Sequence, residues 1–162
     1  MQYDDLVRAV TVAVTFCAYL TGHYIGDQWI QTGSQACKKA LDGTEARVCA
    51  MWHCAKHVTT WTATTVLVLA VAGWWLHLPL RPGWLCAGIA LNAVTHFVID
   101  LRTPLIWVAN LLGRGMYMEH CQVVRPAGAE RTGPGTAVFH LDQAAHIAFL
   151  FVAALITAGP PF

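Results

Sequence analysis

The chain has 162 residues, of which 56% are hydrophobic and only 12% charged, with a mean hydropathy of +0.48. Soluble domains carry roughly 25% charged residues, so this composition favours a membrane protein built as one domain of a few helices. The net charge of +1, together with basic residues that do not alternate with aromatic ones, excludes a nucleic-acid partner.

Four apolar stretches are long enough to cross the hydrocarbon core of a bilayer, which takes about 20 residues in a helix. They cover approximately 6–25, 51–76, 84–101 and 139–157. The predicted fold class is therefore all-α, an integral membrane protein whose single domain, 1–162, is a bundle of four transmembrane helices. The first stretch follows an acidic leader, MQYDDLVRAV, so we expect it to be retained rather than cleaved as a signal peptide.

The connections between these stretches differ in length and composition. Residues 33–50 are polar and predict a short helix, whereas HLPLRPG predicts a tight hairpin. In the segment RTPLIWVANLLG, Thr103 as N-cap and Pro104 at the first helical position predict a short amphipathic helix over about 103–112 at the membrane interface. The Gly- and Pro-rich remainder, about 113–138, predicts a flexible connection.

The distribution of charge predicts an orientation. The connections 33–50 and 102–138, with the adjacent Lys56, hold eight of the ten basic residues, and Arg8 and Arg81 lie on the other side. The positive-inside rule then places both long connections in the cytoplasm and both termini outside. Six cysteines form no CxxC pair, and we interpret most of them as small core residues rather than ligands; they are Cys17, Cys37, Cys49, Cys54, Cys86 and Cys121.

Polar residues inside the spans repeat a spacing of four, which places them on one face of a helix. They are His23, Asp27 and Gln31 at the end of the first span, His53 and His57 at the start of the second, His96 and Asp100 at the end of the third, and Asp142, Gln143 and His146 at the start of the fourth. Ends of odd spans and starts of even spans share one side of a membrane. We therefore expect four helices to bring these side chains to one depth.

Ionisable groups among membrane helices are costly unless they are paired, hydrated or ligated. One such pair is often only a structural contact between helices, but the convergence of four favours a metal centre. Imidazoles and carboxylates suit Zn, Mn or Fe, and the set is large enough for one or two divalent ions. The predicted ligands are His23, Asp27, His57, His96, Asp100, Asp142 and His146; the predicted catalytic groups are Asp27, Asp100 and Asp142; Gln31, Gln143 and His53 are predicted to support them.

These boxes resemble a known family. The sequence resembles small bacterial polytopic membrane proteins known only as a domain of unknown function, in its actinobacterial form. The motifs that carry the resemblance are HxxxDxxxQT from His23, KHVTTWT, NAVTHFVIDLRTPL and LDQAAH. HFVIDLRTP resembles, more distantly, a box of inner-membrane metal-dependent hydrolases. The resemblance covers about 23–155 and implies a bacterial inner membrane. It also implies that the predicted ligands, with Gln31 and Gln143, are the family boxes, and that His53 and His140 are additions.

Four functions remain open at this point. The leading one is a metal-dependent hydrolase acting on a phosphoester or lipid-linked substrate from the cytoplasmic side of the bilayer. The second is divalent-cation transport, disfavoured because the polar residues crowd one leaflet, although a homo-oligomer could supply a path. The third is a haem or diiron redox centre. The fourth is a structural or partner-binding subunit whose polar cluster only fixes helix register.

Overall fold

The structure, a computed structural model, describes residues 3–41, 46–126 and 128–160. Within them, four helices are long and apolar enough to cross a membrane, which confirms the all-α prediction and identifies a membrane protein. They are α1 (Tyr3–Ile25) with its π-helical continuation η1 (Gly26–Ile30), α3 (Arg47–Trp75), α4 (Pro82–Asp100) and α7 (Ala137–Ala158). Positions 42–45 and 127, which fall in the two long predicted connections, lie outside the described residues.

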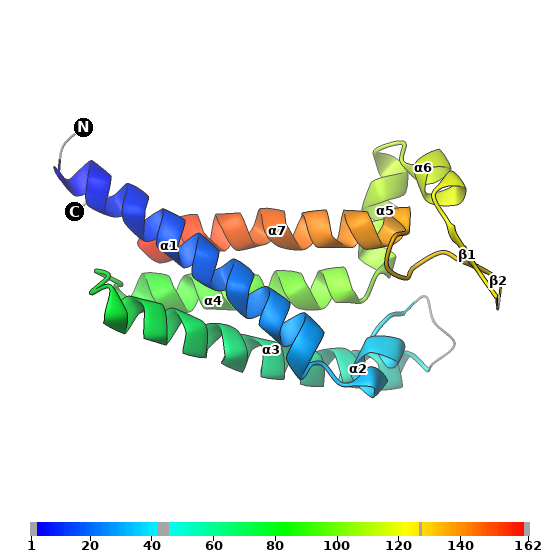
Figure 1. Cartoon of the computed structure of the whole chain (residues 1–162), viewed down its shortest axis with the longest axis horizontal. Helices are drawn as coiled ribbons and strands as arrows, with labels where there is room; N and C mark the ends of the chain where they lie inside the picture. The colour runs from blue at the N-terminus through cyan, green and yellow to red at the C-terminus, as the bar shows by residue number, and fades with distance from the viewer. Residues whose placement is uncertain (1–2, 42–45, 127, 161–162) are drawn as a thin grey trace.

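The four long helices form a bundle in which α1 crosses α3 obliquely (Figure 1). The crossing depends on two glycines four residues apart, because a Cβ built at Gly22 would lie 2.8 Å from the Thr65 Cα and one built at Gly26 would collide with the Trp61 ring. Gly88 plays the same part between α4 and α7, where its missing Cβ makes room for Thr157. Small residues spaced in this way let membrane helices approach closely.

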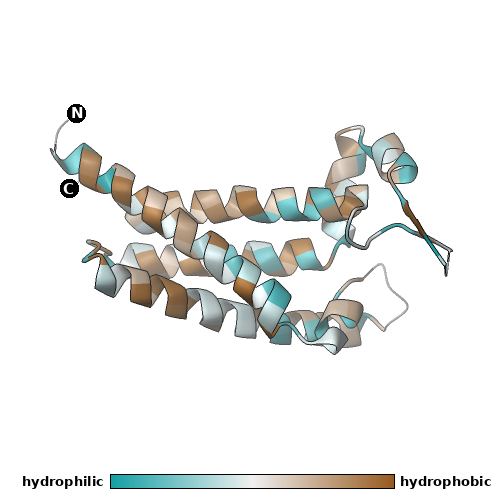
Figure 2. Cartoon of the chain, in the orientation of Figure 1, coloured by the Kyte–Doolittle hydropathy of each residue, from teal (hydrophilic) through white to brown (hydrophobic). Residues whose placement is uncertain are grey.

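An apolar core fills the half of the bundle that lies toward the chain termini. Tyr19, Trp61, Leu69, Leu150 and Ala153 are at most 3% exposed there. The Tyr19 hydroxyl is 2.8 Å from the Thr157 hydroxyl, so the phenol is buried with its polar group paired. In Figure 2 the hydrophilic residues of α4 and α7 lie in the other half.

The cysteines correct one sequence interpretation. Among the six free cysteines only Cys54 is buried and Cys49 is half-buried, whereas Cys17, Cys37, Cys86 and Cys121 are exposed. The interpretation of most cysteines as core residues is therefore wrong. Cys17 and Cys86 lie on spanning helices, where the exterior of a membrane bundle faces lipid, so an apolar position there does not imply the core.

A short helix, α2 (Gly33–Lys38), follows η1. Its start is a capping box: the Thr32 hydroxyl accepts from the Gln35 amide at 3.3 Å, and the Gln35 side chain accepts from the Thr32 amide at 2.8 Å. After α2, the Leu41 amide donates to the Leu101 carbonyl at 3.1 Å, which ties this segment to the end of α4.

The connection between α4 and α7 is folded in its described part. It holds α5 (Thr103–Leu111), α6 (Gly115–His120) and an antiparallel hairpin of β1 (Val123–Arg125) and β2 (Gly128–Glu130), whereas the sequence predicts a flexible segment after 112. The predicted N-cap Thr103 is the first residue of α5, and the N-cap is Arg102 with φ of 59°. This left-handed residue turns α5 across the direction of α4 (Figure 1).

Candidate metal centre

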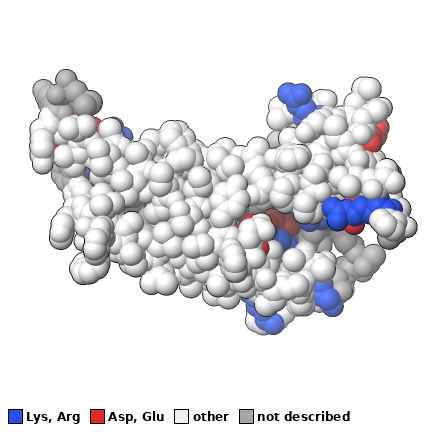
Figure 3. Space-filling model, in the orientation of Figure 1, with Lys and Arg blue, Asp and Glu red and all other residues white. Residues whose placement is uncertain are grey.

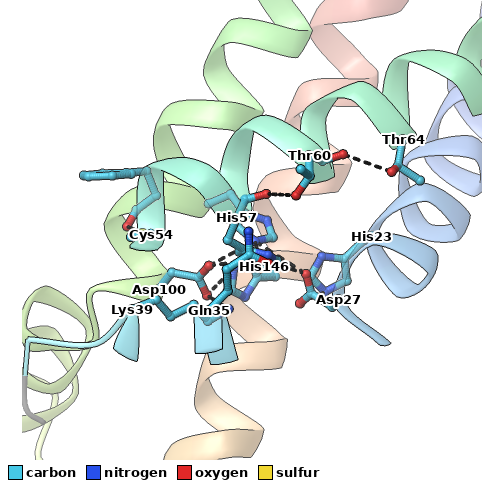
Figure 4. A network of polar contacts seen from close by, with 12 residues as sticks. His23, Asp27, Gln35, Lys39, Cys54, His57, Thr60, Thr64, Asp100 and His146 are labelled. Atoms are coloured by element: carbon cyan, nitrogen blue, oxygen red, sulfur yellow. Dashed lines mark hydrogen bonds and ion pairs between the residues drawn. The ribbon is translucent and has the colours of Figure 1, made fainter. Parts of the chain in front are cut away.

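Four histidines from four helices meet in the polar half of the bundle (Figure 4). Each is at most 2% exposed, and Asp100 is 3% exposed; the histidines are His23, His57, His96 and His146. Asp27 joins them from η1 with 9% of its side chain exposed. The structure thus brings together the ends of the odd spans and the starts of the even spans.

Four of the side-chain atoms have the mutual spacing of metal ligands. The Nε2 of His57 lies 3.1 Å from the His96 Nε2, 3.2 Å from the Asp27 Oδ1 and 3.3 Å from the Asp100 Oδ2. The Nε2 of His96 lies 3.6 Å and 3.3 Å from the same two oxygens. Ligands about 2.1 Å from a tetrahedral ion are about 3.4 Å apart, so each of these five distances is close to the spacing of two ligands on one ion. Two groups of three could hold an ion, His57 with His96 and Asp100, and His23 with Asp27 and His96.

The remaining oxygens of the two aspartates face other partners. The Oδ2 of Asp27 lies 3.8 Å from the His23 Nε2. The Oδ1 of Asp100 lies 2.8 Å from the Lys39 Nζ and 3.9 Å from the His146 Nε2. His23 and Lys39 therefore contact the second oxygens of these two carboxylates, on the side away from the four converging atoms.

His146 is held by the residue one turn before it. Its Nδ1 lies 2.9 Å from the Asp142 carbonyl and 3.5 Å from the Asp142 carboxylate, whose other contact is the Gln143 amide at 3.2 Å. Since a main-chain carbonyl only accepts, Nδ1 carries the proton and Nε2 presents its lone pair toward Asp100. Asp142 thus orients His146, at a distance from the four converging atoms.

Two predicted supporting residues lie at the edge of the centre. His53 is half-buried on α3, and within the described residues its Nδ1 has no hydrogen-bond partner. Gln31 lies beyond η1, where the Gln31 amide bonds to the Gly26 carbonyl five residues back. This π turn shifts Gln31 relative to His23 and Asp27, which an uninterrupted α-helix would place on one face.

Sequence reasoning missed two residues of the site. It counted Lys39 only as a cytoplasmic charge, but the side chain is 11% exposed and pairs with Asp100. It read Trp61 only as part of an apolar span, but its ring centroid lies 4.2 Å from that of His96. The sequence signal that bears on Lys39 is TGSQ at 32–35, because this capping-box pattern fixes where the short helix preceding Lys39 begins.

Several buried atoms of the centre lack ordinary partners. Within the described residues, neither the Asp27 Oδ1 nor the Asp100 Oδ2 has a well-formed hydrogen bond, and the same holds for both ring nitrogens of His23. Buried polar groups are normally satisfied, and an unpaired buried carboxylate oxygen is costly. A cation between these atoms would satisfy both oxygens, so the donor set fits a metal ion.

A cavity of about 570 Å³ adjoins the centre. Asp27, Lys39, Asp100 and Asp142 lie on its wall, together with Arg102 from the turn before α5. In Figure 3 acidic and basic atoms meet in a hollow toward the end of the molecule that carries α2 and the hairpin. Asp27 and Asp100, whose carboxylates contribute two of the four converging atoms, therefore also border a space large enough for a small polar group.

The fold and the site define a polytopic helical membrane protein with a buried His/Asp cluster that could hold a metal ion. The chain belongs to the family described as protein of unknown function, DUF3307, which matches residues 15–160 and thus all four boxes. No curated protein and no solved structure matches the chain.

Proposed function

We propose that the protein is a membrane-embedded, divalent-metal-dependent hydrolase. The observation that supports it most is the metal-ligand spacing of the His57, His96 and Asp100 side-chain atoms beside a polar cavity. Structural zinc sites are closed, whereas catalytic sites keep access for water or substrate. A centre whose two carboxylates also line a cavity belongs to the second kind.

The residues have separate roles in this proposal. His57, His96 and Asp100 would hold the ion, with Asp27 beside them, and an ion held by three protein ligands keeps a position for water. When bound, the ion would supply Lewis-acid polarisation and an activated water. The Nε2 of His146, with its lone pair fixed by the Asp142 carbonyl, is placed to accept a proton from a group entering beside Asp100. The Trp61 ring packs against the His96 ring and separates the centre from the apolar core, which would keep water out of that core.

The substrate is an anionic phosphoester or a lipid-linked ester. Lys39 and Arg102 are the basic residues on a cavity wall that also carries Asp27, Asp100, Glu130 and Asp142, so an anion would bind between these two cations and the ion. Trp107 on α5, Leu112 directly after α5 and Met116 on α6 are each at least 66% exposed. Because α5 lies across the spans, this apolar surface fits a helix at headgroup depth, which would bring a lipid substrate to the cavity (Figure 1).

The orientation follows the same reasoning. We place α2 and the α4–α7 connection in the cytoplasm of a bacterial inner membrane and both termini outside. The support is the excess of Lys and Arg at the end that carries the centre, visible in Figure 3, over Arg8 and Arg81 at the other. The lipid bilayer is then the principal partner, and a homo-oligomer is compatible with this arrangement.

Transport is a weaker reading of the same centre. The helices beyond it pack Tyr19, Leu69 and Leu150 into a core that is at most 3% exposed. A path for an ion would need ligands through that half as well, where the buried polar side chains of the described residues are threonines and Asn92, with no carboxylate or imidazole among them. Transport therefore requires an interface between copies of the chain, whereas hydrolysis requires only the cavity.

The test begins with elemental analysis of the detergent-purified protein after loading with Zn²⁺ or Mn²⁺. The variants are Asp27→Ala with Asp100→Ala, and His140→Ala as an exposed control. We expect stoichiometric metal and hydrolysis of p-nitrophenyl phosphate or phosphatidic acid in the wild type and control, and neither in the monodisperse double variant. A wild type that takes up no ion overturns the metal centre, while bound ion without hydrolysis overturns the hydrolase.

A further inference from the structure

Lys39 is a buried lysine whose ammonium lies beside the metal ligands. Only 11% of its side chain is exposed, and its Nζ is 2.8 Å from the Asp100 Oδ1. A lysine near the membrane interface usually extends its ammonium toward water, because burying the charge is costly. Here the side chain turns inward to one carboxylate oxygen of the centre (Figure 4).

The backbone around Lys39 is fixed at both ends. The Thr32–Gln35 capping box starts α2, and the Lys39 amide donates to the Gln35 carbonyl at 3.1 Å. Two residues further on, Leu41 is hydrogen-bonded to Leu101, directly after Asp100. The ion pair is therefore held by the fold on both sides and is not a chance contact of a long surface side chain.

The two oxygens of Asp100 divide the centre into two cation positions. Oδ2 faces the Nε2 atoms of His57 and His96 at 3.3 Å each, and this side suits the divalent ion. Oδ1 faces Lys39 and, at 3.9 Å, the Nε2 of His146, which has no hydrogen-bond partner among the described residues. A second ion bridged by Asp100 would have to take the place that the ammonium group occupies.

Charge balance gives the same result. With neutral histidines, one divalent ion and the Lys39 ammonium balance the three carboxylates of Asp27, Asp100 and Asp142. Two divalent ions would leave excess positive charge in a site where every histidine is buried. The structure therefore favours one ion.

We propose that Lys39 is the second cation of the centre: the protein binds one divalent ion per chain, and Lys39 binds an oxygen of a phosphoryl group whose other oxygen reaches that ion. An ammonium has three donors, and Asp100 takes one, so two remain for an anion in the cavity that Lys39 lines. In two-metal hydrolases the second ion has this clamping role. The inference rests on the proposed function and deepens it by naming the phosphoryl group as the part of the substrate that is bound.

The experiment uses the full chain loaded with Mn²⁺ in detergent. Elemental analysis gives Mn per chain, and the relaxation of the ³¹P signal of inorganic phosphate reports anion binding next to the paramagnetic ion. The variants are Lys39→Met, Lys39→Arg and the neighbouring control Lys38→Met. We expect one Mn in the wild type, and in Lys39→Met an undiminished Mn content with phosphate bound about tenfold or more weakly. Lys39→Arg and Lys38→Met keep phosphate affinity within about threefold of the wild type, since both retain a cation at 39.

Two Mn per wild-type chain, or unchanged phosphate affinity in Lys39→Met, overturns the inference and leaves the metal centre standing. A wild type without Mn overturns the proposed function itself. If Lys39→Met is not monodisperse, the wild-type stoichiometry and the phosphate affinity of Lys39→Gln decide. A second arm replaces inorganic phosphate with dihexanoyl phosphatidic acid: tighter binding of the lipid supports a lipid source for the phosphoryl group, and equal binding supports a free phosphoester.

Discussion

The Nε2 atoms of His57 and His96 lie 3.1 Å apart, although the two residues belong to different membrane helices. Both nitrogens are also 3.3 Å from one oxygen of Asp100. A proton on one Nε2 atom can be shared with the other nitrogen or donated to the Asp100 oxygen, so it serves one of these three contacts at a time. A divalent ion is the simplest group that all three atoms can bind at once.

Removing either imidazole should therefore release the ion. We expect His57→Ala and His96→Ala to weaken Zn²⁺ or Mn²⁺ binding by about 100-fold or more, because each deletes one proposed ligand of the ion. Equilibrium dialysis with elemental analysis measures this. His140→Ala, an exposed histidine on α7, is the matched control. Full metal content in both ligand variants would contradict the assignment.

Asp142 should behave differently from the ligands. Its carboxylate lies 3.5 Å from the His146 Nδ1, so it orients that ring without belonging to the four-atom cluster. We expect Asp142→Asn to keep the metal and to lower phosphoester hydrolysis by about 10- to 100-fold. Metal content and initial rates on the same preparation check this, and loss of the ion would instead make Asp142 a ligand.

Gly88 should be the position where an added methyl group harms the bundle most. A Cβ there would lie 2.8 Å from the Ala153 carbonyl and 3.0 Å from the Tyr19 hydroxyl, so α4 and α7 would have to separate. We expect Gly88→Ala to lower the free energy of unfolding by about 1–3 kcal/mol. Thermal unfolding in detergent measures it. Gly83→Ala, with nothing within 4 Å of the new Cβ, serves as control and should leave stability unchanged or raised.

The native cysteines report the orientation of the chain. Cys37 on α2 and Cys121 after α6 are exposed at the end that carries the centre. We expect a charged maleimide to label both in inside-out membrane vesicles and neither in intact spheroplasts, because the reagent does not cross the membrane and the proposed orientation places both on the cytoplasmic side. Cys17 and Cys86 lie on spanning helices, where lipid shields them from the reagent. Mass spectrometry of the labelled peptides locates the sites. Labelling of Cys37 from outside would reverse the proposed orientation.

The surface of α5 tests whether the substrate is a lipid. Leu112, directly after α5, is 68% exposed, and a charge there would oppose contact with the acyl region. We expect Leu112→Glu to reduce hydrolysis of phosphatidic acid in vesicles by about tenfold while leaving p-nitrophenyl phosphate hydrolysis unchanged. Equal loss on both substrates would show a structural effect rather than a membrane contact.

The sequence was sufficient for the parts of this molecule that depend on periodicity. The four spans follow from apolar length, and the approach of His23 to Asp27 and of His96 to Asp100 follows from a spacing of four on a helix. Alternation of the spans then placed all four boxes at one depth. These inferences need only local geometry and the direction of each helix.

The parts that failed depend on the path of the chain outside the spans. Lys39 reaches Asp100 because α2 folds back under the bundle, and its charge alone gave no sign of that. The exposed Cys17 and Cys86 could not be distinguished from the buried Cys54, because lipid and protein interior select the same residue types. Thr103 was misplaced as a cap because the left-handed residue Arg102 precedes it.

The π turn of η1 carries a consequence for how this chain can change in length. The Gln31 amide donates to the Gly26 carbonyl five residues back, whereas an α-helical amide bonds to the carbonyl four residues back. The extra residue in this turn changes the position from which the chain continues into α2. Deleting one residue, such as Gln28, would restore regular α-helical bonding and redirect the start of α2, moving Lys39 away from Asp100. Such a deletion would stabilise the helix locally and separate Lys39 from Asp100, so the length of this turn shapes the candidate metal centre as much as any side chain does.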